Sequence, residues 1–197
     1  MAKGAGSTRN NNNSNLIHRL EKSENWFIST GINRYNNEPN KDYSDMSDLS
    51  TDEKRVLVAY LTNSSREINK SLRGEIEDKD ASLLADLVSK SVKKLKSYQG
   101  ETYRQVKFER EKDYKNFISL YKKGEIITEK GFISSGLNKQ KITKKFYGNY
   151  EVKFTIKSKN GKNITHYNNE EKEILFDRNT KFKVISIRGN NIKLEEV

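Results

Sequence analysis

Residues 169–176 read Asn169-Glu170-Glu171-Lys172-Glu173-Ile174-Leu175-Phe176, a run of acids that leads into a short apolar stretch. The apolar residues predict a strand, and the acids predict the end of the loop before it. Side chains along a strand alternate in direction, so Glu171 and Glu173 are expected to point to the same side and to act as a pair. The alternative is a solvated surface cluster, and under either interpretation Glu170 has no assigned role.

The composition favours a folded protein with a polar, basic surface. Hydrophobic residues make up 32% of the 197, and aromatic residues at 10% argue against wholesale disorder. The absence of cysteine excludes a disulfide, a thiolate metal site and a cysteine nucleophile. The net charge of +11 fits an anionic cofactor, an acidic partner or nucleic acid. No zinc-finger, helix-turn-helix or aromatic RNA-binding pattern accompanies it, so nucleic-acid binding is possible but not indicated.

The sequence contains no signal for a membrane or for secretion. No apolar run approaches the roughly 20 residues of a membrane-spanning helix. The N-terminal residues lack the apolar segment of a secretory signal peptide. We therefore expect a location in the cytoplasm of the producing or infected cell, or export without a signal peptide.

The chain is predicted to consist of an arm and one domain. Residues 1–15 are small, polar and asparagine-rich, which predicts a disordered arm. Residues 16–197 are expected to form a single domain, with short or irregular structure before Leu49 that becomes ordered near Trp26.

Two helices are predicted in the first half of this domain. One runs from about Thr51 to Leu72, with Ser50 or Thr51 as its N-cap and Gly74 at its end. Asp80 is the expected cap of a second helix, whose apolar stripe comprises Leu83, Leu84, Leu87, Val88, Val92 and Leu95.

The second half is richer in strands. Strand patterns cover residues 101–108, the stretch that Gly124 opens, and residues 150–156, while residues 112–121 and 138–146 predict short helices. Asn160-Gly161 predicts a turn, and residues 181–187 and 191–195 predict a terminal hairpin. Helices followed by strands indicate the α+β class.

Polar side chains of the strand-rich half form the candidate site. Arg104 lies inside the first predicted strand and Ser134 at the end of the next one. Glu171 and Glu173 precede a third strand. Taken singly, each of these residues fits an ordinary surface or turn position, and only the ordered set of arginine, serine and glutamate points to a shared site.

This set resembles the mono-ADP-ribosyltransferases of the arginine–serine–glutamate class, which include clostridial binary-toxin enzyme components, C3-type exoenzymes and ecto-ADP-ribosyltransferases. The resemblance covers roughly Trp26 to Glu196. It is carried by Tyr103-Arg104, by Gly131-Phe132-Ile133-Ser134-Ser135, and by Glu171–Phe176 followed by Thr180–Val184. The serine motif departs from the family in one position, because Gly136 stands where the last serine of Ser-Thr-Ser is often found.

The resemblance implies N-terminal helices packed on a split mixed β-sheet core, in an ADP-ribosyltransferase-like β-sandwich. It implies NAD as co-substrate, no metal, and transfer of ADP-ribose to a protein arginine with release of nicotinamide. The residues that it places against NAD are Tyr103, Arg104, Phe132, Ser134 and Glu173.

Each candidate receives a role from the same resemblance. Arg104 binds the NAD phosphates, and Ser134 orients Glu173. Glu173 stabilises the oxocarbenium-like transition state at the ribose. Glu171 positions and deprotonates the acceptor arginine. The loop over residues 161–170 is expected to recognise the acceptor, with Tyr167 as the side chain that touches it.

Two alternatives remain open at this point. An NAD glycohydrolase would use the same residues, with water in place of the protein acceptor. A basic binding or structural module with an inactive fold of this family would explain the charge and the polar arm, but it leaves the joint presence of Arg104, Ser134, Glu171 and Glu173 unexplained.

Overall fold

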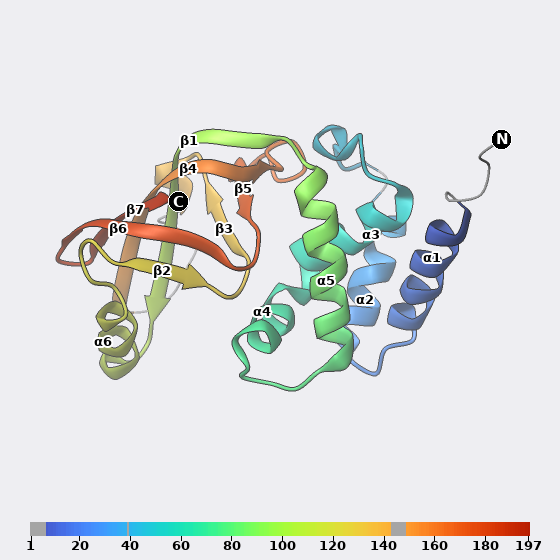
Figure 1. The fold of residues 1–197 in the computed structure, drawn as a ribbon, viewed down its shortest axis with the longest axis horizontal. Coiled ribbons are helices and arrows are strands. Elements are labelled where there is room, and N and C mark those ends of the chain that lie inside the picture. The colour runs from blue at the N-terminus through green and yellow to red at the C-terminus, as the bar shows by residue number, and fades with distance from the viewer. Residues whose placement is uncertain (1–6, 39, 143–148) are drawn as a thin grey trace. The chain divides into compact units, whose positions relative to one another are not determined.

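The computed structural model describes residues 7–38, 40–142 and 149–197 (Figure 1). The chain divides into two compact units. One comprises the residues up to Lys41 together with Met46–Lys94, and the other comprises Asp42–Asp45 and Leu95–Val197. The expectation of a single domain over residues 16–197 stays a prediction.

The first unit is helical, with its elements coloured from blue to green in Figure 1. Its elements are α1 (Ser7–Glu21), α2 (Trp26–Arg34), the 3-10 turn η1 (Tyr35–Asn37), α3 (Thr51–Ala59), the π-helical turn η3 (Tyr60–Ser64), α4 (Ser65–Arg73) and α5 (Lys79–Lys94). A further 3-10 turn, η2 (Ser44–Met46), spans the point where the chain passes between the units.

The helix predicted from about Thr51 to Leu72 is confirmed, with an interruption that the sequence pattern did not reveal. Ser50 forms a capping box with Glu53, so the first turn of α3 has its backbone donors satisfied. The π-helical turn η3 then separates α3 from α4. Gly74 ends α4 with a left-handed φ of 77°, a conformation that suits glycine.

The second predicted helix is also present, but its cap is Asp78 and not Asp80. The Oδ1 atom of Asp78 accepts hydrogen bonds from the backbone N–H groups of Asp80 and Ala81, each at 2.9 Å. The Asp80 carboxylate instead accepts from Arg19 at 2.7 Å and from Ser23 at 2.7 Å. The Asp80 side chain therefore binds residues that are distant in sequence and does not cap the helix.

Residues 7–15, part of the predicted disordered arm, lie in α1, while residues 1–6 lie outside the described residues. Asparagine is a weak helix former, so this segment has little intrinsic helical tendency. Contacts of the C-terminal half stabilise α1, because Ile17 and Leu20 are buried and Arg19 pairs with Asp80. The expectation of a disordered arm over residues 1–15 stays a prediction.

The second unit is built on a seven-stranded sheet of order β1-β3-β5-β4-β7-β6-β2. Only the β4–β7 pair is parallel among the pairings of this sheet within the described residues, so the sheet is mixed. The strands are β1 (Ser97–Phe108), β2 (Ile126–Glu129), β3 (Ile133–Gly136), β4 (Tyr150–Asn163), β5 (Glu173–Phe176), β6 (Thr180–Arg188) and β7 (Asn191–Glu196), with the helices α6 (Glu111–Ser119) and α7 (Lys139–Ile142). The α+β class and the terminal hairpin are confirmed; residues 143–146 of the helix expected over 138–146 lie outside the described residues.

The strands β1, β3, β5 and β4 form a closed circuit of pairings, because β1 also pairs directly with β4. The alternation predicted for residues 150–156 is correct: Val152, Phe154 and Ile156 are buried. They share one apolar core with Ile174 and Phe176 of β5. The strand that opens with Glu173 is thus fixed by core packing immediately after its first residue.

Asn160-Gly161 does not form the predicted turn and instead lies within β4. Glu196, buried at the end of β7, accepts hydrogen bonds from the backbone N–H groups of Lys159 at 2.6 Å and Asn160 at 2.7 Å. Glycine suits the next position, because a Cβ on Gly161 would lie 2.7 Å from a methyl carbon of Ile174. The carboxylate of Glu196 therefore stabilises extended backbone in a sequence that favours a turn. The end of β4 continues beyond this point and pairs with β5.

Candidate functional site

The centre of the candidate site is the carboxylate of Glu173, the first residue of β5. It is buried, with 6% of its surface exposed. The Ser134 hydroxyl on β3 donates to Glu173 Oε1 at 2.5 Å, and the Asn168 side-chain amide donates to Oε2 at 2.9 Å. Each carboxylate oxygen therefore has its own donor, which fixes the plane of the group.

The register of the sheet places Arg104, on β1, close to Ser134 on β3. Tyr103 of β1 pairs with Gly136 of β3, and Gly136 pairs with Glu173 of β5. The Nη1 atom of Arg104 donates to the backbone oxygen of Ser134 at 2.6 Å. A guanidinium has five N–H donors, so this bond leaves most of them for an anion. The predicted arginine, serine and glutamate are thus brought together by neighbouring strands.

A cleft opens beside these residues. Its lining comprises Tyr103, Arg104, Gln105, Ser134, Ser135, Gly136 and Glu171. Gln105 donates through its side-chain amide to Glu151, which fixes the orientation of the amide. Its Oε1 atom is buried and has no hydrogen-bond partner in the described part of the chain. The cleft therefore combines a cation and an acid, a set that fits a ligand with phosphates and hydroxyls.

Glu171 reaches this cleft by a different route from the one predicted. Strand β5 begins only at Glu173, so Glu171 lies in the preceding turn and the two acids do not share a strand face. Lys172 between them has a positive φ of 50°, which breaks the strand alternation. Glu171 is half-buried and lines the cleft, whereas Glu170 is exposed. Glu171 therefore lies near Glu173 because of the turn at Lys172, and not because the two acids alternate along one strand.

The surroundings of Glu173 raise its pKa above the ordinary value. Burial is the main cause that raises the pKa of Glu173 above its ordinary value, and the charge of Glu171 adds to the rise. The hydrogen bonds from Ser134 and Asn168 and the charge of Arg104 act in the opposite direction. Loss of any of these three groups is therefore expected to raise the pKa further.

The remaining predicted NAD contacts, Tyr103 and Phe132, lie in different surroundings. Tyr103 lines the cleft, and the Lys139 ammonium lies 5.5 Å from the centre of its ring. Phe132, just before β3, is buried with 3% of its surface exposed and is not part of the cleft lining. Gly136 is the last residue of strand β3, so the Ser134-Ser135-Gly136 motif is part of a strand.

The segment between β4 and β5 contains the residue that sequence reasoning missed, Asn168. No sequence pattern around Asn168 indicates that its side chain contacts Glu173. Tyr167, expected to touch an acceptor, is 6% exposed, and its ring centre lies 5.6 Å from that of Tyr43. His166 is exposed and contacts Asp45. This burial argues against the predicted contact of Tyr167 with an acceptor.

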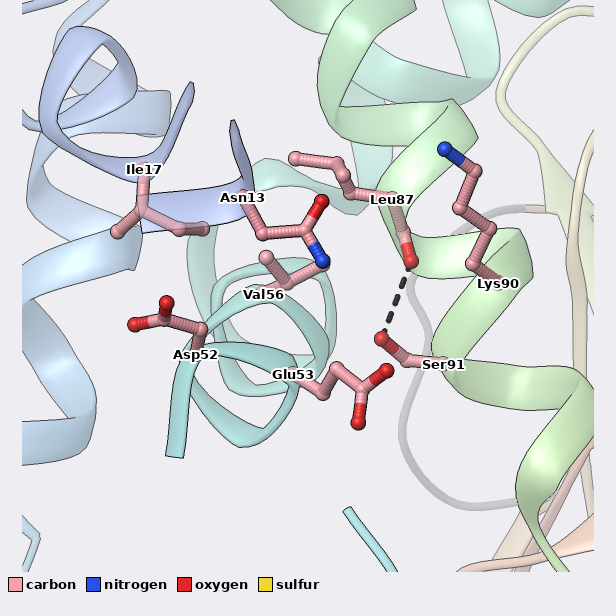
Figure 2. Close-up of a pocket in the computed structure, with 8 residues that line it drawn as sticks. All are labelled: Asn13, Ile17, Asp52, Glu53, Val56, Leu87, Lys90 and Ser91. Carbon is pink, nitrogen blue, oxygen red and sulfur yellow. Dashed lines mark hydrogen bonds between the residues drawn. The ribbon is translucent and has the colours of Figure 1, made fainter. Parts of the chain in front are cut away.

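A second hollow lies within the helical unit between α1, α3 and α5 (Figure 2). Its acids and its hydroxyl already have partners: Asp52 accepts from Ser14, Glu53 pairs with Lys94, and the Ser91 hydroxyl donates to the backbone oxygen of Leu87. A hollow whose acids and hydroxyl are satisfied internally has little to offer a polar ligand. We therefore assign the candidate site to the cleft at Arg104.

No group of three or more histidine, cysteine, aspartate or glutamate side chains among the described residues could hold a metal ion. No helix in that part of the chain has the length and apolar character needed to cross a membrane.

Comparisons with known proteins agree on one family. The family model described as ADP-ribosyltransferase exoenzyme matches residues 32–196. Mav of Mycobacterium avium (strain 104), whose name proposes an NAD(+)–arginine ADP-ribosyltransferase, is 30% identical over 141 residues. That match covers 70% of this chain but only 16% of Mav, so the chain spans a small part of this relative.

Solved structures show the same fold at low sequence identity. The eucaryotic mono-ADP-ribosyltransferase ART2.2 matches with a TM-score of 0.72 at 17% identity, covering 98% of this chain and 87% of that one. The Vibrio splendidus ADP-ribosyltransferase Vis, in complex with agmatine, matches with a TM-score of 0.63 at 17% identity, covering 100% of this chain and 88% of that one.

Proposed function

The chain belongs to the ADP-ribosyltransferase exoenzyme family, and on that premise we propose that it transfers ADP-ribose from NAD to an arginine side chain of a protein and releases nicotinamide. The observation that carries the proposal is the Glu173 carboxylate on β5, buried beside a cleft and held by two donors, with Arg104 on β1 bonded to the intervening strand β3. Such an arrangement is costly for stability, and it suits a group that must meet positive charge.

Glu173 acts on the ribose. Cleavage of the bond between nicotinamide and ribose develops oxocarbenium character at the sugar, as in glycoside hydrolysis. A fixed carboxylate stabilises that charge without having to reorganise during the reaction. Ser134 keeps the carboxylate in place through its hydrogen bond to Oε1.

Arg104 holds the phosphates of NAD. The guanidinium of Arg104 is suited to the phosphate oxygens, and its bond to the backbone of Ser134 keeps it close to the reacting centre.

Glu171 selects the acceptor. A guanidinium is always protonated and so is a poor nucleophile. A half-buried carboxylate in the cleft lining can hold it by paired hydrogen bonds and take a proton as the nitrogen attacks. The name of Mav and the agmatine bound to Vis, a guanidinium compound, support arginine as the acceptor type.

The test uses NAD labelled in the adenine half. We expect the protein to release nicotinamide and to transfer label to an arginine-containing protein, and the Glu173→Gln variant to do neither at a comparable rate. Free labelled ADP-ribose without labelled protein would refute the transferase assignment in favour of an NAD glycohydrolase. Unchanged turnover in Glu173→Gln would refute the assigned role of that residue.

A further inference from the structure

The segment between β4 and β5 is held in one conformation by its own backbone. The N–H of Ile164 donates to the backbone oxygen of Glu173 at 3.1 Å. Asn168 N–H donates to the oxygen of Ile164 at 3.1 Å, and Lys172 N–H donates to the oxygen of Asn168 at 2.9 Å. Both the backbone N–H and the backbone oxygen of Asn168 are therefore hydrogen-bonded. This fixes the backbone at Asn168 and with it the direction of the side chain.

A second set of contacts fixes the outer part of the same segment. The Asp45 carboxylate accepts from the His166 backbone N–H at 2.5 Å and lies 2.8 Å from His166 Nδ1. Its side chain is only 7% exposed. The rings of Tyr43 and Tyr167 pack together next to this ion pair. Residues 42–45 belong to the same compact unit as the strands, although the chain on either side of them belongs to the helical unit.

We propose that Asn168 is a positioning residue for Glu173, and that Asp45 is the anchor that keeps the segment where Asn168 reaches the carboxylate. The proposal deepens the proposed function and rests on it. A segment expected to meet the acceptor is thereby connected directly to the carboxylate that acts on NAD.

The geometry explains why Ser134 alone is insufficient. The last torsion of a glutamate side chain is broad, so a single donor leaves the carboxylate plane free to turn. Ser134 holds Oε1 from β3, and Asn168 holds Oε2 from the opposite, loop side. The other charged groups that act on Glu173 are Glu171 and Arg104. Asn168 opposes the repulsion from Glu171 by stabilising the ionised form.

The test compares Asn168→Ala with Asn169→Ala, a control at the adjacent, exposed asparagine. The first readout is the pKa of Glu173, followed by NMR of the 13C-labelled side-chain carboxyl and assigned with Glu173→Gln. We expect Asn168→Ala and Asp45→Ala to raise this pKa, Asn168→Asp to raise it further because it adds a carboxylate, and Asn169→Ala to leave it unchanged.

The second readout is nicotinamide release in the presence of agmatine. We expect kcat to fall about 10-fold or more in Asn168→Ala, the effect of one lost hydrogen bond to a charged group. The dissociation constant for NAD should stay near that of the wild type, which separates positioning from binding. Asp45→Ala should change kcat in the same direction.

The outcomes separate this proposal from the proposed function. An unchanged Glu173 pKa in Asn168→Ala, or a raised pKa with unchanged kcat, would overturn the positioning role while wild-type turnover upheld the function. Absence of turnover in the wild type would refute the function, and the titration would still decide whether Asn168 holds the carboxylate.

Discussion

Replacing Ser134 with alanine isolates the hydrogen bond that orients the central carboxylate. The change removes the donor 2.5 Å from Glu173 Oε1 and leaves the contact of Arg104, which is made to the backbone oxygen of the same residue. A hydrogen bond to a charged group contributes about 1.5–3 kcal/mol, and each 1.36 kcal/mol corresponds to a factor of about ten in rate. We expect kcat for nicotinamide release to fall about 10- to 100-fold, with little change in the dissociation constant for NAD.

The pH dependence of the same variant supplies an independent readout. The Ser134 hydrogen bond lowers the pKa of Glu173, which burial raises. Its loss moves the acid limb of the kcat profile to higher pH, because the ionised carboxylate is the active form. Ser135→Ala is the matched control, since the Ser135 hydroxyl donates to the backbone oxygen of Ile174 and does not touch Glu173. Equal profiles for wild type and Ser134→Ala, with equal kcat, would refute the reasoning.

Three further changes test other parts of the site. Arg104→Lys keeps the charge but loses the planar donor pair, so we expect the dissociation constant for NAD, measured by calorimetry, to rise about tenfold; an unchanged constant would remove Arg104 from the phosphate site. Gly161→Ala would force a Cβ to within 2.7 Å of neighbouring side-chain atoms, and urea unfolding should show a loss of about 1–3 kcal/mol; full stability would mean that β4 and β5 can separate there. Glu173 has a raised folded-state pKa, so the stability it contributes below its ordinary value of 4.5 is lost as the pH rises through the folded value. The stability of Glu173→Gln relative to the wild type should therefore improve as the pH rises from 4.5 through the folded-state pKa, and a constant difference would contradict the direction of the pKa shift.

Local patterns were sufficient for most of the strands and for the two central helices. The alternation over residues 150–156 survives folding because one face of β4 packs into an apolar core. Ser50 and Gly74 act through contacts within a few residues of themselves, so their positions as helix cap and helix end are readable.

The errors come from partners that are distant in sequence. Glu196 supplies the acceptor that keeps Asn160-Gly161 within a strand. Tyr43 covers Tyr167, which leaves the predicted acceptor contact buried. In each case, a side chain from another element satisfies a group that the local sequence leaves unsatisfied, and no periodicity reports such a contact.

The site shows the same division. Arg104, Ser134 and Glu173 were identified as an ordered set, and the register of β1, β3 and β5 brings them together. Asn168 was missed because its significance depends on the direction of one amide in an irregular segment. Glu171 reaches the cleft through the turn at Lys172, which the strand alternation did not predict.

The measurement that tests the central claim most directly is the product formed from labelled NAD and agmatine by the wild type and by Glu171→Gln. We predict that the wild type forms ADP-ribosyl-agmatine. The Glu171→Gln variant should lose this product at least tenfold more than it loses nicotinamide release, because only the acceptor step needs Glu171. Absence of ADP-ribosyl-agmatine with the wild type, or its formation at an undiminished rate by Glu171→Gln, would contradict the account.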